Sequence, residues 1–375
     1  MSGSVGLVRV DDIARAYDFG ASHPLRPERV LLTYAAIAEL GLLDLPHVDT
    51  RPARSASVAE IEAAHDAEFV AVVQGIDEGR LPPGRGLLYG LGTPDNPIFA
   101  GMHAASAAVC GASLTAAEMV ARGEVDHAFN PAGGLHHARR SEASGFCIYN
   151  DPAVAIAGVL DLHPDWRVIY VDVDVHHGDG VQWIFYDDPR VLTVSLHQSG
   201  RSLYPGTGFE DEVGSGPGEG TAINVPLMPR TGEDDYLWAL TRVVEAAAGA
   251  FRPHLMLTQL GSDTHYGDPL ANLGLTMRAY PRMARILHEA AHAWCSGRLV
   301  ATGGGGYQFD TVVPRAWTIH FAEMCGAPDL IPAAWLEDRA SGDVSRSYRD
   351  ELERSVDLVL GRTLPHLKSL AGSPA

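Results

Sequence analysis

The chain lacks the cysteine pattern of a disulfide-stabilised or zinc-finger protein. Its 375 residues include four cysteines, and no two of them form a CxxC pair. Cys110, Cys147, Cys295 and Cys325 lie far apart in the sequence. Such spacing is typical of free, buried thiols in a reducing compartment. We therefore expect a cytoplasmic protein without a disulfide framework.

The chain also lacks an excess of basic residues. Lys and Arg number 28 against 47 Asp and Glu, which gives a formal net charge of −19 at pH 7. Binding to nucleic acid depends on a basic face that attracts phosphates, so we expect no nucleic-acid partner. An acidic protein favours cationic or neutral small partners instead.

Long apolar runs are missing as well. Asp11, Asp12 and Arg15 interrupt the N-terminal region, which therefore does not have the apolar core of a signal peptide. The least charged stretch, Phe99 to Ala117, is rich in Ala, Ser and Gly and contains His103. This composition is typical of a packed helix and not of a membrane span. Hydrophobic residues still make up 46% of the chain, enough for a large core, and we expect no membrane partner.

Apolar strand patterns alternate with helical patterns along the chain. Strands are expected at Val168 to Val175, Val191 to Ser195, Ala222 to Val225, Leu255 to Leu260 and Arg298 to Ala301, and helices at Val30 to Leu40, Ser57 to Val73, Phe99 to Arg122, Asp151 to Leu160, Gly178 to Tyr186, Glu233 to Phe251, Thr276 to Trp294 and within residues 326–370. Residues 1–22 and 41–56 show no pattern of either kind. No repeat or linker divides the sequence, so we predict a single α/β domain over residues 1–375. Its central sheet is expected to be mostly parallel and flanked by helices.

One expected strand ends in a cluster of acidic and imidazole side chains. Val168 to Val175 is β-branched and aromatic, which suits a strand buried on both faces. Asp172, Asp174 and His176 follow one another at spacings of two, so their side chains are expected on one face. Two unpaired carboxylates in a core are costly unless a cation binds them. Asp174 and His176 therefore predict a site for zinc or another divalent ion, the alternative being that the Asp residues cap the next helix.

Asp263 is the candidate third ligand. It follows the apolar run Leu255 to Leu260, as Asp174 follows its own strand, and ligands in parallel sheets bind at the carboxyl ends of the strands. Three protein ligands leave a coordination position for water, which is typical of a catalytic metal. Standing alone, Asp263 would be interpreted as a surface-loop residue. The other histidines near these segments, His177, His197 and His265, are further candidate ligands, although each is expected to support the ligands from behind or to be structural.

A Gly-rich turn ends in two adjacent histidines, His136 and His137. Neighbouring imidazoles close to a cation do not protonate together, so their pKa values should separate. Asp172 and Asp179 are the carboxylates expected to orient them, one for each histidine. A structural pair in the core is the alternative, against which the Gly-Gly turn and the two carboxylates argue.

Tyr307 follows four glycines. A phenol there could donate a hydrogen bond to a carbonyl oxygen that becomes an oxyanion. A phosphate-binding loop is the competing interpretation, but no Gly-Lys-Ser/Thr follows. The residues together predict metal-assisted hydrolysis of an amide or a similar carbonyl compound, with a histidine that moves the proton.

These motifs closely resemble the histone deacetylase superfamily, which has the arginase/deacetylase fold. Within it the chain is most similar to the bacterial acetoin-utilization group, close to the class I enzymes. The matching stretches, in the family's order, are residues 134–138, 142–151, 172–181, 193–197, 204–208, 259–263 and 303–307. The resemblance as a whole covers roughly residues 20 to 325.

The resemblance implies two cation sites. One zinc ion per chain would be bound by Asp174, His176 and Asp263. A monovalent cation, usually potassium, would lie beside it at Asp172, Asp174, His176, Ser195 and Leu196.

The resemblance also implies catalytic roles. His137, paired with Asp179, would be the main general base and acid. His136, paired with Asp172, would assist electrostatically. Tyr307 would polarise the acetyl carbonyl.

Further positions match the family's substrate and product contacts. They are Gly145, Phe146 and Tyr204 in the acyl-lysine tunnel, Leu270 near its mouth, Asp95 at the rim that holds the substrate backbone, and Arg29 in an inner cavity linked to acetate release. Tyr204 stands where the family often has Phe, and His265 and Tyr266 replace residues that are commonly small. These departures keep the chemistry and leave the acyl-chain preference open.

The expected function is zinc-dependent deacetylation of N-ε-acetyl-lysine in proteins or peptides, with acetyl-coenzyme A synthetase as a natural target. An acetylpolyamine amidohydrolase of the same fold is the first alternative. A dimanganese ureohydrolase lacks its second ligand set, and a non-catalytic binder of acetyl-lysine is disfavoured because every catalytic position is filled. Corepressor partners are not implied, and the oligomeric state is left open.

Overall fold

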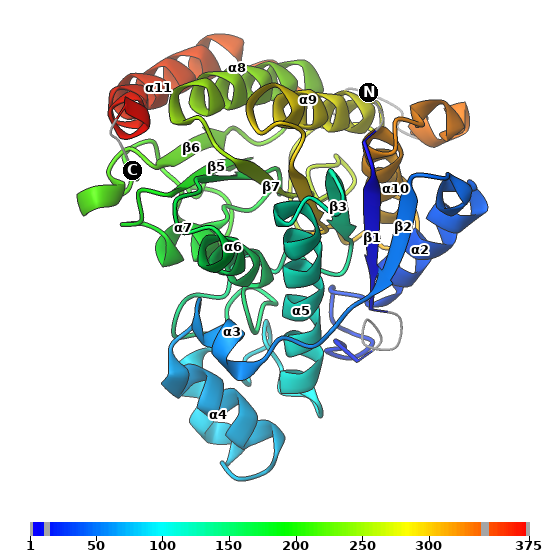
Figure 1. The fold of residues 1–375 in the computed structure, drawn as a ribbon, viewed down its shortest axis with the longest axis vertical. Coiled ribbons are helices and arrows are strands. Elements are labelled where there is room, and N and C mark those ends of the chain that lie inside the picture. Colours follow the sequence, from blue (N-terminus) through cyan, green and yellow to red (C-terminus); the bar gives the residue numbers. More distant parts are fainter. Residues whose placement is uncertain (1–2, 11–15, 339–344, 373–375) are drawn as a thin grey trace.

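Eight short segments pair side by side in the computed structural model, which describes residues 3–10, 16–338 and 345–372 (Figure 1). They form one sheet with the strand order β2-β1-β3-β8-β7-β4-β5-β6, and every neighbouring pair is parallel. The strands are β1 (Val5–Arg9), β2 (Val48–Pro52), β3 (His127–Asn130), β4 (Val168–Asp172), β5 (Val191–Gln198), β6 (Ala222–Leu227), β7 (Leu255–Gln259) and β8 (Leu299–Thr302). The predicted fold class, a single α/β domain with a parallel sheet, is confirmed.

Helices cover both faces of this sheet. They are α2 (Glu28–Glu39), α3 (Val58–Glu62), α4 (Ala67–Asp77), α5 (Met102–Ala121), α6 (Asp151–Leu162), α7 (Asp179–Ile184), α8 (Glu233–Phe251), α9 (Ala279–Trp294), α10 (Val313–Met324) and α11 (Arg349–Gly372). In Figure 1, α8, α9 and α11 lie along one face, and α5 and α6 lie along the other. Every residue of β4, β5 and β7 is buried, as expected for a parallel sheet covered twice.

The helix α5 is long and apolar enough to cross a membrane by length and composition, but 83% of its apolar window is buried inside the protein. It packs against α6 and the strands β1 and β3. Its small residues let the backbone of residues 54–56 approach the helix closely, because a Cβ added at Gly111 would lie 2.0 Å from the carbonyl oxygen of Arg54. α5 is therefore a helix of the core. The four cysteines are free and buried, also as predicted.

The sequence prediction missed the first two strands. β1 and β2 lie in residues 1–22 and 41–56, where no pattern is visible. β2 is an edge strand of the sheet, and every one of its residues is half-buried or exposed. Such a strand is held by its backbone hydrogen bonds and needs no alternating apolar side chains.

Two boundaries also differ from prediction. The helix expected from Ser57 to Val73 is two helices, α3 and α4, although the predicted capping box of Ser57 and Glu60 is present. The central strand ends at Asp172, so Asp174 and His176 belong to the following loop. The reason is local: Oδ1 of Asp172 accepts the backbone N–H of Asp174 at 3.1 Å, and Oδ1 of Asp174 accepts that of His176 at 3.0 Å. These turns replace the regular pairing of the strand.

Buried His65 ties the first part of the chain to the loops that follow β3. Its Nε2 accepts the backbone N–H of Asn150 at 2.9 Å, and its Nδ1 lies 2.9 Å from the carbonyl oxygen of Arg139. This arrangement needs a neutral ring, and burial lowers the pKa of His65 to about 4.

The pKa of this histidine predicts a loss of stability in acid. The unfolded chain takes up the proton near pH 6.5, so the contribution of His65 is complete above that pH and is lost as the pH falls toward 4. We expect it to remove about 3 kcal/mol from the free energy of unfolding over this range. Urea denaturation at several pH values should show that the free energy of unfolding falls less between pH 6.5 and 4 in His65→Gln than in the wild type. His366→Gln, at an exposed position, should show the same fall as the wild type. An equal fall in all three proteins would contradict the assignment.

Candidate active site

Four neighbouring strands deliver the polar side chains predicted to form a site. In the sheet order β3-β8-β7-β4, each strand leads into one of the predicted motifs. The two histidines follow β3, the glycines and Tyr307 follow β8, Asp263 follows β7, and the Asp and His residues of the metal motif follow β4. All four loops therefore leave the same edge of the sheet, at the carboxyl ends of its strands, where parallel sheets bind their ligands.

Asp174, His176 and Asp263 form one buried group. One ligand atom from each lies within 4.8 Å of the others. Nδ1 of His176 is 3.0 Å from Oδ1 of Asp174 and 3.2 Å from Oδ2 of Asp263. The expected meeting of the three side chains from two separate strands is thus observed.

The electrostatics of this group fit a divalent cation. Burial disfavours a charged His176, yet the hydrogen bonds and charges of Asp174 and Asp263 raise its pKa to about 10. Burial and the charge of Asp174 raise the pKa of Asp263 to about 7. Two fully buried carboxylates thus hold a proton between them on an imidazole, and a metal ion can take the place of that proton. Two carboxylate oxygens and one imidazole nitrogen are a donor set that suits zinc.

The carboxylates of the group are held by partners that the sequence prediction did not name. Oδ2 of Asp174 accepts hydrogen bonds from Nε2 of Gln259 and from the backbone N–H of Gly305, both at 2.7 Å. Oδ1 of Asp263 accepts the backbone N–H of Val175 at 2.9 Å. These bonds turn the other oxygen of each carboxylate toward His176. The visible signal for Gln259 was a polar residue at the end of an apolar strand.

The adjacent histidines each have their own carboxylate, in the predicted pairing. Nδ1 of His136 lies 2.7 Å from Oδ2 of Asp172, and Nδ1 of His137 lies 2.7 Å from Oδ1 of Asp179. Each Nδ1–H donates to its carboxylate, so both Nε2 atoms face the site, 3.1 Å apart.

The pKa values of the two histidines are separated. Burial opposes the charge on His136, but the carboxylates of Asp172 and Asp174 outweigh it and raise its pKa to about 9. Burial and the charge of His136 lower the pKa of His137 to about 4, although Asp179 acts in the other direction. His137 is therefore the neutral member of the pair and can accept a proton.

Three further residues position this pair. The hydroxyl of Tyr170 donates to Oδ2 of Asp172 at 2.7 Å. Nη2 of Arg139 lies 3.2 Å from Oδ2 of Asp179. The amide of Asn150 donates to the carbonyl oxygens of His136 and Ala138, both at 2.9 Å. The sequence gave a signal for Tyr170, which precedes Asp172 by two positions on β4 and therefore shares its face.

A small inner cavity of about 20 Å³ adjoins both groups. Its lining includes Arg29, His136, His137, Gly145, Phe146, Asp174 and Tyr307. Burial and the nearby carboxylate of Asp263 raise the pKa of Tyr307 well above its usual value, so the phenol keeps its proton. The rings of Phe146 and Tyr307 meet edge to face at 5.8 Å, and the ring of Tyr204 lies edge-on to His137 at 5.1 Å.

Arg29 lies behind the site. Its guanidinium is buried, donates to the carbonyl oxygen of Gly304 at 2.6 Å and lies over the ring of Trp317 at 5.2 Å. Arg29 and Leu135 line both the inner cavity and a second cavity of about 20 Å³ beside it. A cation thus lies next to the cavity of the two histidines, as the resemblance implies.

Comparison with known proteins agrees with this geometry. The family model described as the histone deacetylase domain matches residues 23–324. The chain belongs to the histone deacetylase family. Membership of this family makes it a hydrolase that acts on acetyl amides, and implies a metal ion for which Asp174, His176 and Asp263 offer ligands.

The deacetylase is similar to several bacterial proteins along most of its length. The acetoin utilization protein AcuC of Bacillus subtilis (strain 168) is 44% identical over 324 residues, which cover 86% of this chain and 83% of that protein. AcuC of Staphylococcus xylosus is 31% identical over 364 residues, or 96% and 94% of the two chains. AcuC of Staphylococcus aureus (strain MRSA252) is 35% identical over 323 residues, or 85% and 82%.

Three predicted substrate residues of the deacetylase, Asp95, Tyr204 and Leu270, do not line the inner cavity. Tyr204 contacts His137, and the other two connect to the cavity through neighbouring residues. Asp95 is exposed, and its carbonyl oxygen lies 3.3 Å from Nε2 of His23, whose ring packs on Phe146 at 4.5 Å. Leu270 is half-buried, and its backbone N–H donates to Asp268, which also accepts the backbone N–H of Tyr307.

The residues of the predicted potassium site lie on adjacent strands. Ser195 of β5 pairs in register with Asp172 of β4. The Oγ of Ser195 is 2.9 Å from Nδ1 of His197, and the next residue, Leu196, is buried. The register thus brings both Ser195 and Asp172 to the segment that carries Asp174 and His176.

The remaining histidines of these segments have structural partners. His177 bonds to Thr207 and Gln182, and His197 bonds to the carbonyl oxygen of Gly208. His265 pairs with Asp338 at 2.9 Å.

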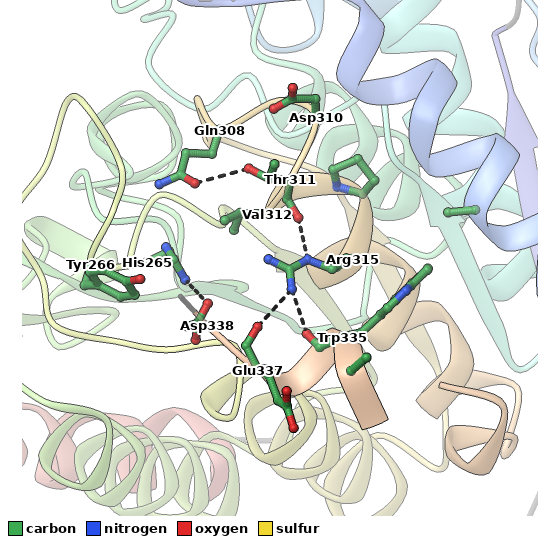
Figure 2. A pocket seen from close by; sticks show the side chains of 13 residues that line it. His265, Tyr266, Gln308, Asp310, Thr311, Val312, Arg315, Trp335, Glu337 and Asp338 are labelled. Atoms are coloured by element: carbon green, nitrogen blue, oxygen red, sulfur yellow. Dashed lines mark hydrogen bonds and ion pairs between the residues drawn. The ribbon is translucent and has the colours of Figure 1, made fainter. Parts of the chain in front are cut away.

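His265 and Tyr266 line a separate pocket of about 560 Å³ (Figure 2). Arg315 crosses it and donates to the carbonyl oxygens of Trp335 and Glu337 at 3.1 and 3.3 Å. Among the residues that the structure describes, none lines both this pocket and the inner cavity. The two large residues that depart from the family pattern therefore do not fill the inner cavity.

Proposed function

We propose that this deacetylase hydrolyses the acetyl amide of N-ε-acetyl-lysine, with one zinc ion, and releases acetate. The observation that carries the proposal is the position of a neutral, carboxylate-paired histidine next to the group of three metal-binding side chains. The rings of His137 and His176 are 5.7 Å apart, and both histidines are buried. An acyl carbon placed between them would be within reach of both.

Asp174, His176 and Asp263 are the residues proposed to hold the ion. When bound, zinc supplies Lewis acidity to the amide carbonyl and acidity to a coordinated water molecule. The nearby hydrogen bonds from Gln259 and Gly305 hold the carboxylate of Asp174 in position. Mutation of such outer partners typically lowers metal affinity or activity by about 10- to 100-fold.

The proton movements are proposed to use His137. Its Nδ1–H is held by Asp179, so Nε2 takes the proton of the attacking water and later gives it to the lysine nitrogen as the C–N bond breaks. His136 keeps its own proton because of Asp172, and its positive charge favours the negative transition state. The phenolic O–H of Tyr307 donates a hydrogen bond to the carbonyl oxygen as negative charge develops there.

The substrate is proposed to enter past Asp95 and Leu270, through a tunnel formed by Gly145, Phe146 and Tyr204. Acetate would leave through the two small adjoining cavities that Arg29 lines. A potassium ion at Asp172, Asp174, His176, Ser195 and Leu196 would stabilise the loop that carries the metal ligands.

The physiological substrates are proposed to be acetylated proteins of the cytoplasm, acetyl-coenzyme A synthetase among them. Three similar proteins carry the name acetoin utilization protein, which favours a role in acetate metabolism. The net charge of −19 also favours a second candidate, an acetylpolyamine, because its amines are cationic. Comparing kcat/KM for an acetyl-lysine peptide and for acetylputrescine separates the two, and we expect the peptide to be preferred.

Changing Tyr307 to Phe tests the proposed role of its hydroxyl. Loss of a hydrogen bond made in the transition state should lower kcat for an acetyl-lysine peptide by about 100-fold, with little change in KM. Release of acetate is the measurement. Tyr204→Phe is the matched control, because the hydroxyl of Tyr204 bonds to Ser144 at 2.5 Å, and it should lower kcat far less. A Tyr307→Phe protein with wild-type kcat would remove Tyr307 from the mechanism.

A further inference from the structure

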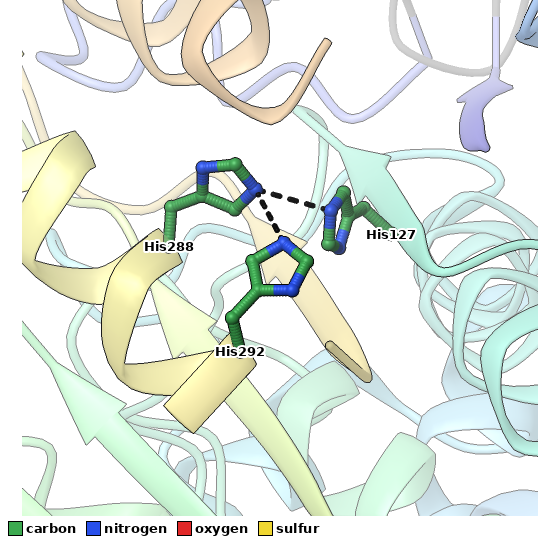
Figure 3. A group of neighbouring side chains, drawn as sticks. All are labelled: His127, His288 and His292. Atoms are coloured by element: carbon green, nitrogen blue, oxygen red, sulfur yellow. Dashed lines mark hydrogen bonds between the residues drawn. The ribbon is translucent and has the colours of Figure 1, made fainter. Parts of the chain in front are cut away.

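Three histidines meet at the other end of β3 from the catalytic pair. His127 is the first residue of this strand, and His288 and His292 lie one turn apart on α9. Figure 3 shows the three rings turned toward one another. Nε2 of His288 is 3.1 Å from Nε2 of His127 and 3.1 Å from Nε2 of His292. The three residues provide ligand atoms within 4.8 Å of one another.

The ring nitrogens of these three histidines cannot all form hydrogen bonds at the same time. Nδ1 of His288 lies 3.4 Å from Oε1 of Glu323, and a hydrogen donated there leaves a single lone pair on Nε2. Both His127 and His292 would then have to donate to that one lone pair. If His127 donates from Nε2, its Nδ1 becomes an acceptor, yet this buried atom has no hydrogen-bond partner among the described residues. The rings thus compete for one acceptor.

A cation between the three Nε2 atoms removes the conflict. Each ring then turns a lone pair inward and keeps its hydrogen on Nδ1. The Nδ1–H of His288 points to Glu323, an arrangement common for histidines that bind metal. His292 is half-buried and leaves a path from solvent.

The distances agree with this arrangement. Zinc binds imidazole nitrogen at about 2.0–2.1 Å with tetrahedral geometry, which places two ligand nitrogens about 3.3 Å apart. Both measured separations are close to that value.

We propose that His127, His288 and His292 form a second metal site, which binds a divalent ion of the zinc, cobalt or nickel class through their three Nε2 atoms. Imidazole is the ligand that these ions share, whereas calcium and magnesium prefer oxygen. The bound ion links α9 to β3 and so stabilises the fold, because it binds the folded chain and not the unfolded one. The fourth position faces the half-buried side of His292.

Counting bound cobalt tests the proposal. The full chain is stripped with a chelator, dialysed against Co²⁺ and analysed for metal per chain, with kcat measured on the same samples after reloading. Wild type and the control His366→Ala, at an exposed histidine, should bind two equivalents. His292→Ala should bind one equivalent and keep the wild-type kcat. Saturating Co²⁺ should raise the Tm of an Asp263→Ala protein by about 4 °C, and this increase should disappear when His292→Ala is added.

The outcomes separate this site from the catalytic one. A wild-type protein that binds one equivalent, or a His292→Ala protein that still binds two, would overturn the second site. An Asp263→Ala protein that binds as much metal as wild type would count against the proposed catalytic site and leave the histidine cluster in place. Should alanine at position 292 lower the yield of folded protein, His292→Gln keeps a polar side chain there and should also bind one equivalent.

Discussion

Replacing His137 by alanine is expected to lower kcat for an acetyl-lysine peptide by about 1,000-fold, within the range that general acid–base catalysis contributes. In the proposed mechanism the ring takes a proton from water and returns it to the leaving amine, whereas its neighbour His136 holds its proton too firmly to do the same. Metal content should stay at the wild-type value, because His137 is not part of the metal-binding group. Acetate release and metal per chain, measured on one preparation, give both results.

Asp179→Asn is the companion variant for this prediction. It keeps the shape of the side chain but removes the charge that orients Nδ1–H of His137, so kcat should fall in the same direction and by less. His136→Ala should also lower kcat, through loss of a positive charge. Turnover at the wild-type rate in His137→Ala would exclude His137 as the base.

Replacing Gly305 by alanine is expected to weaken metal binding strongly at the proposed catalytic site. A Cβ there would lie 2.0 Å from Oδ2 of Asp263 and 2.8 Å from Oδ2 of Asp174, so both carboxylates would have to move. The backbone N–H of Gly305 also donates to Asp174. We expect metal affinity at this site to fall by about 100-fold or more, and turnover to fall with it when metal is limiting.

A titration with Zn²⁺ followed by activity measures this effect. A high concentration of Zn²⁺ should restore part of the turnover, because the variant weakens binding without removing a ligand. Gly361→Ala is the matched control, since a Cβ at that position on α11 meets no atom within 4 Å. It should titrate like wild type. An unchanged Zn²⁺ affinity in Gly305→Ala would show that Asp174 and Asp263 do not bind the metal.

The sequence could predict the residues of the candidate site better than one edge of the sheet. Carboxylates and histidines at the ends of buried strands are costly without a function, so Asp174, Asp263 and His137 stand out from their surroundings. The edge strand β2 does not, because its pairing with β1 uses backbone groups that carry no side-chain signal. The end of β4 was placed too late, since hydrogen bonds between side chain and backbone, and not hydrophobicity, end the strand there.

Contacts between distant segments were also beyond the sequence pattern. His127 and His288 are 161 residues apart, and neither lies in a motif. Gln259 was visible as a polar residue in an apolar strand, but its contact with Asp174 depends on the pairing of β4 with β7. Strand order decides such contacts, and a single sequence shows the strands without their order.

The most direct test of the account is the release of acetate from an acetyl-lysine peptide by metal-stripped protein titrated with Zn²⁺. In the His292→Ala variant, the group of Asp174, His176 and Asp263 is the one that can bind the ion among the described residues. We expect no turnover without metal. Turnover should then rise linearly with added Zn²⁺ and reach its maximum at one equivalent per chain. Full turnover by the stripped protein, or one bound equivalent with no acetate released, would contradict it.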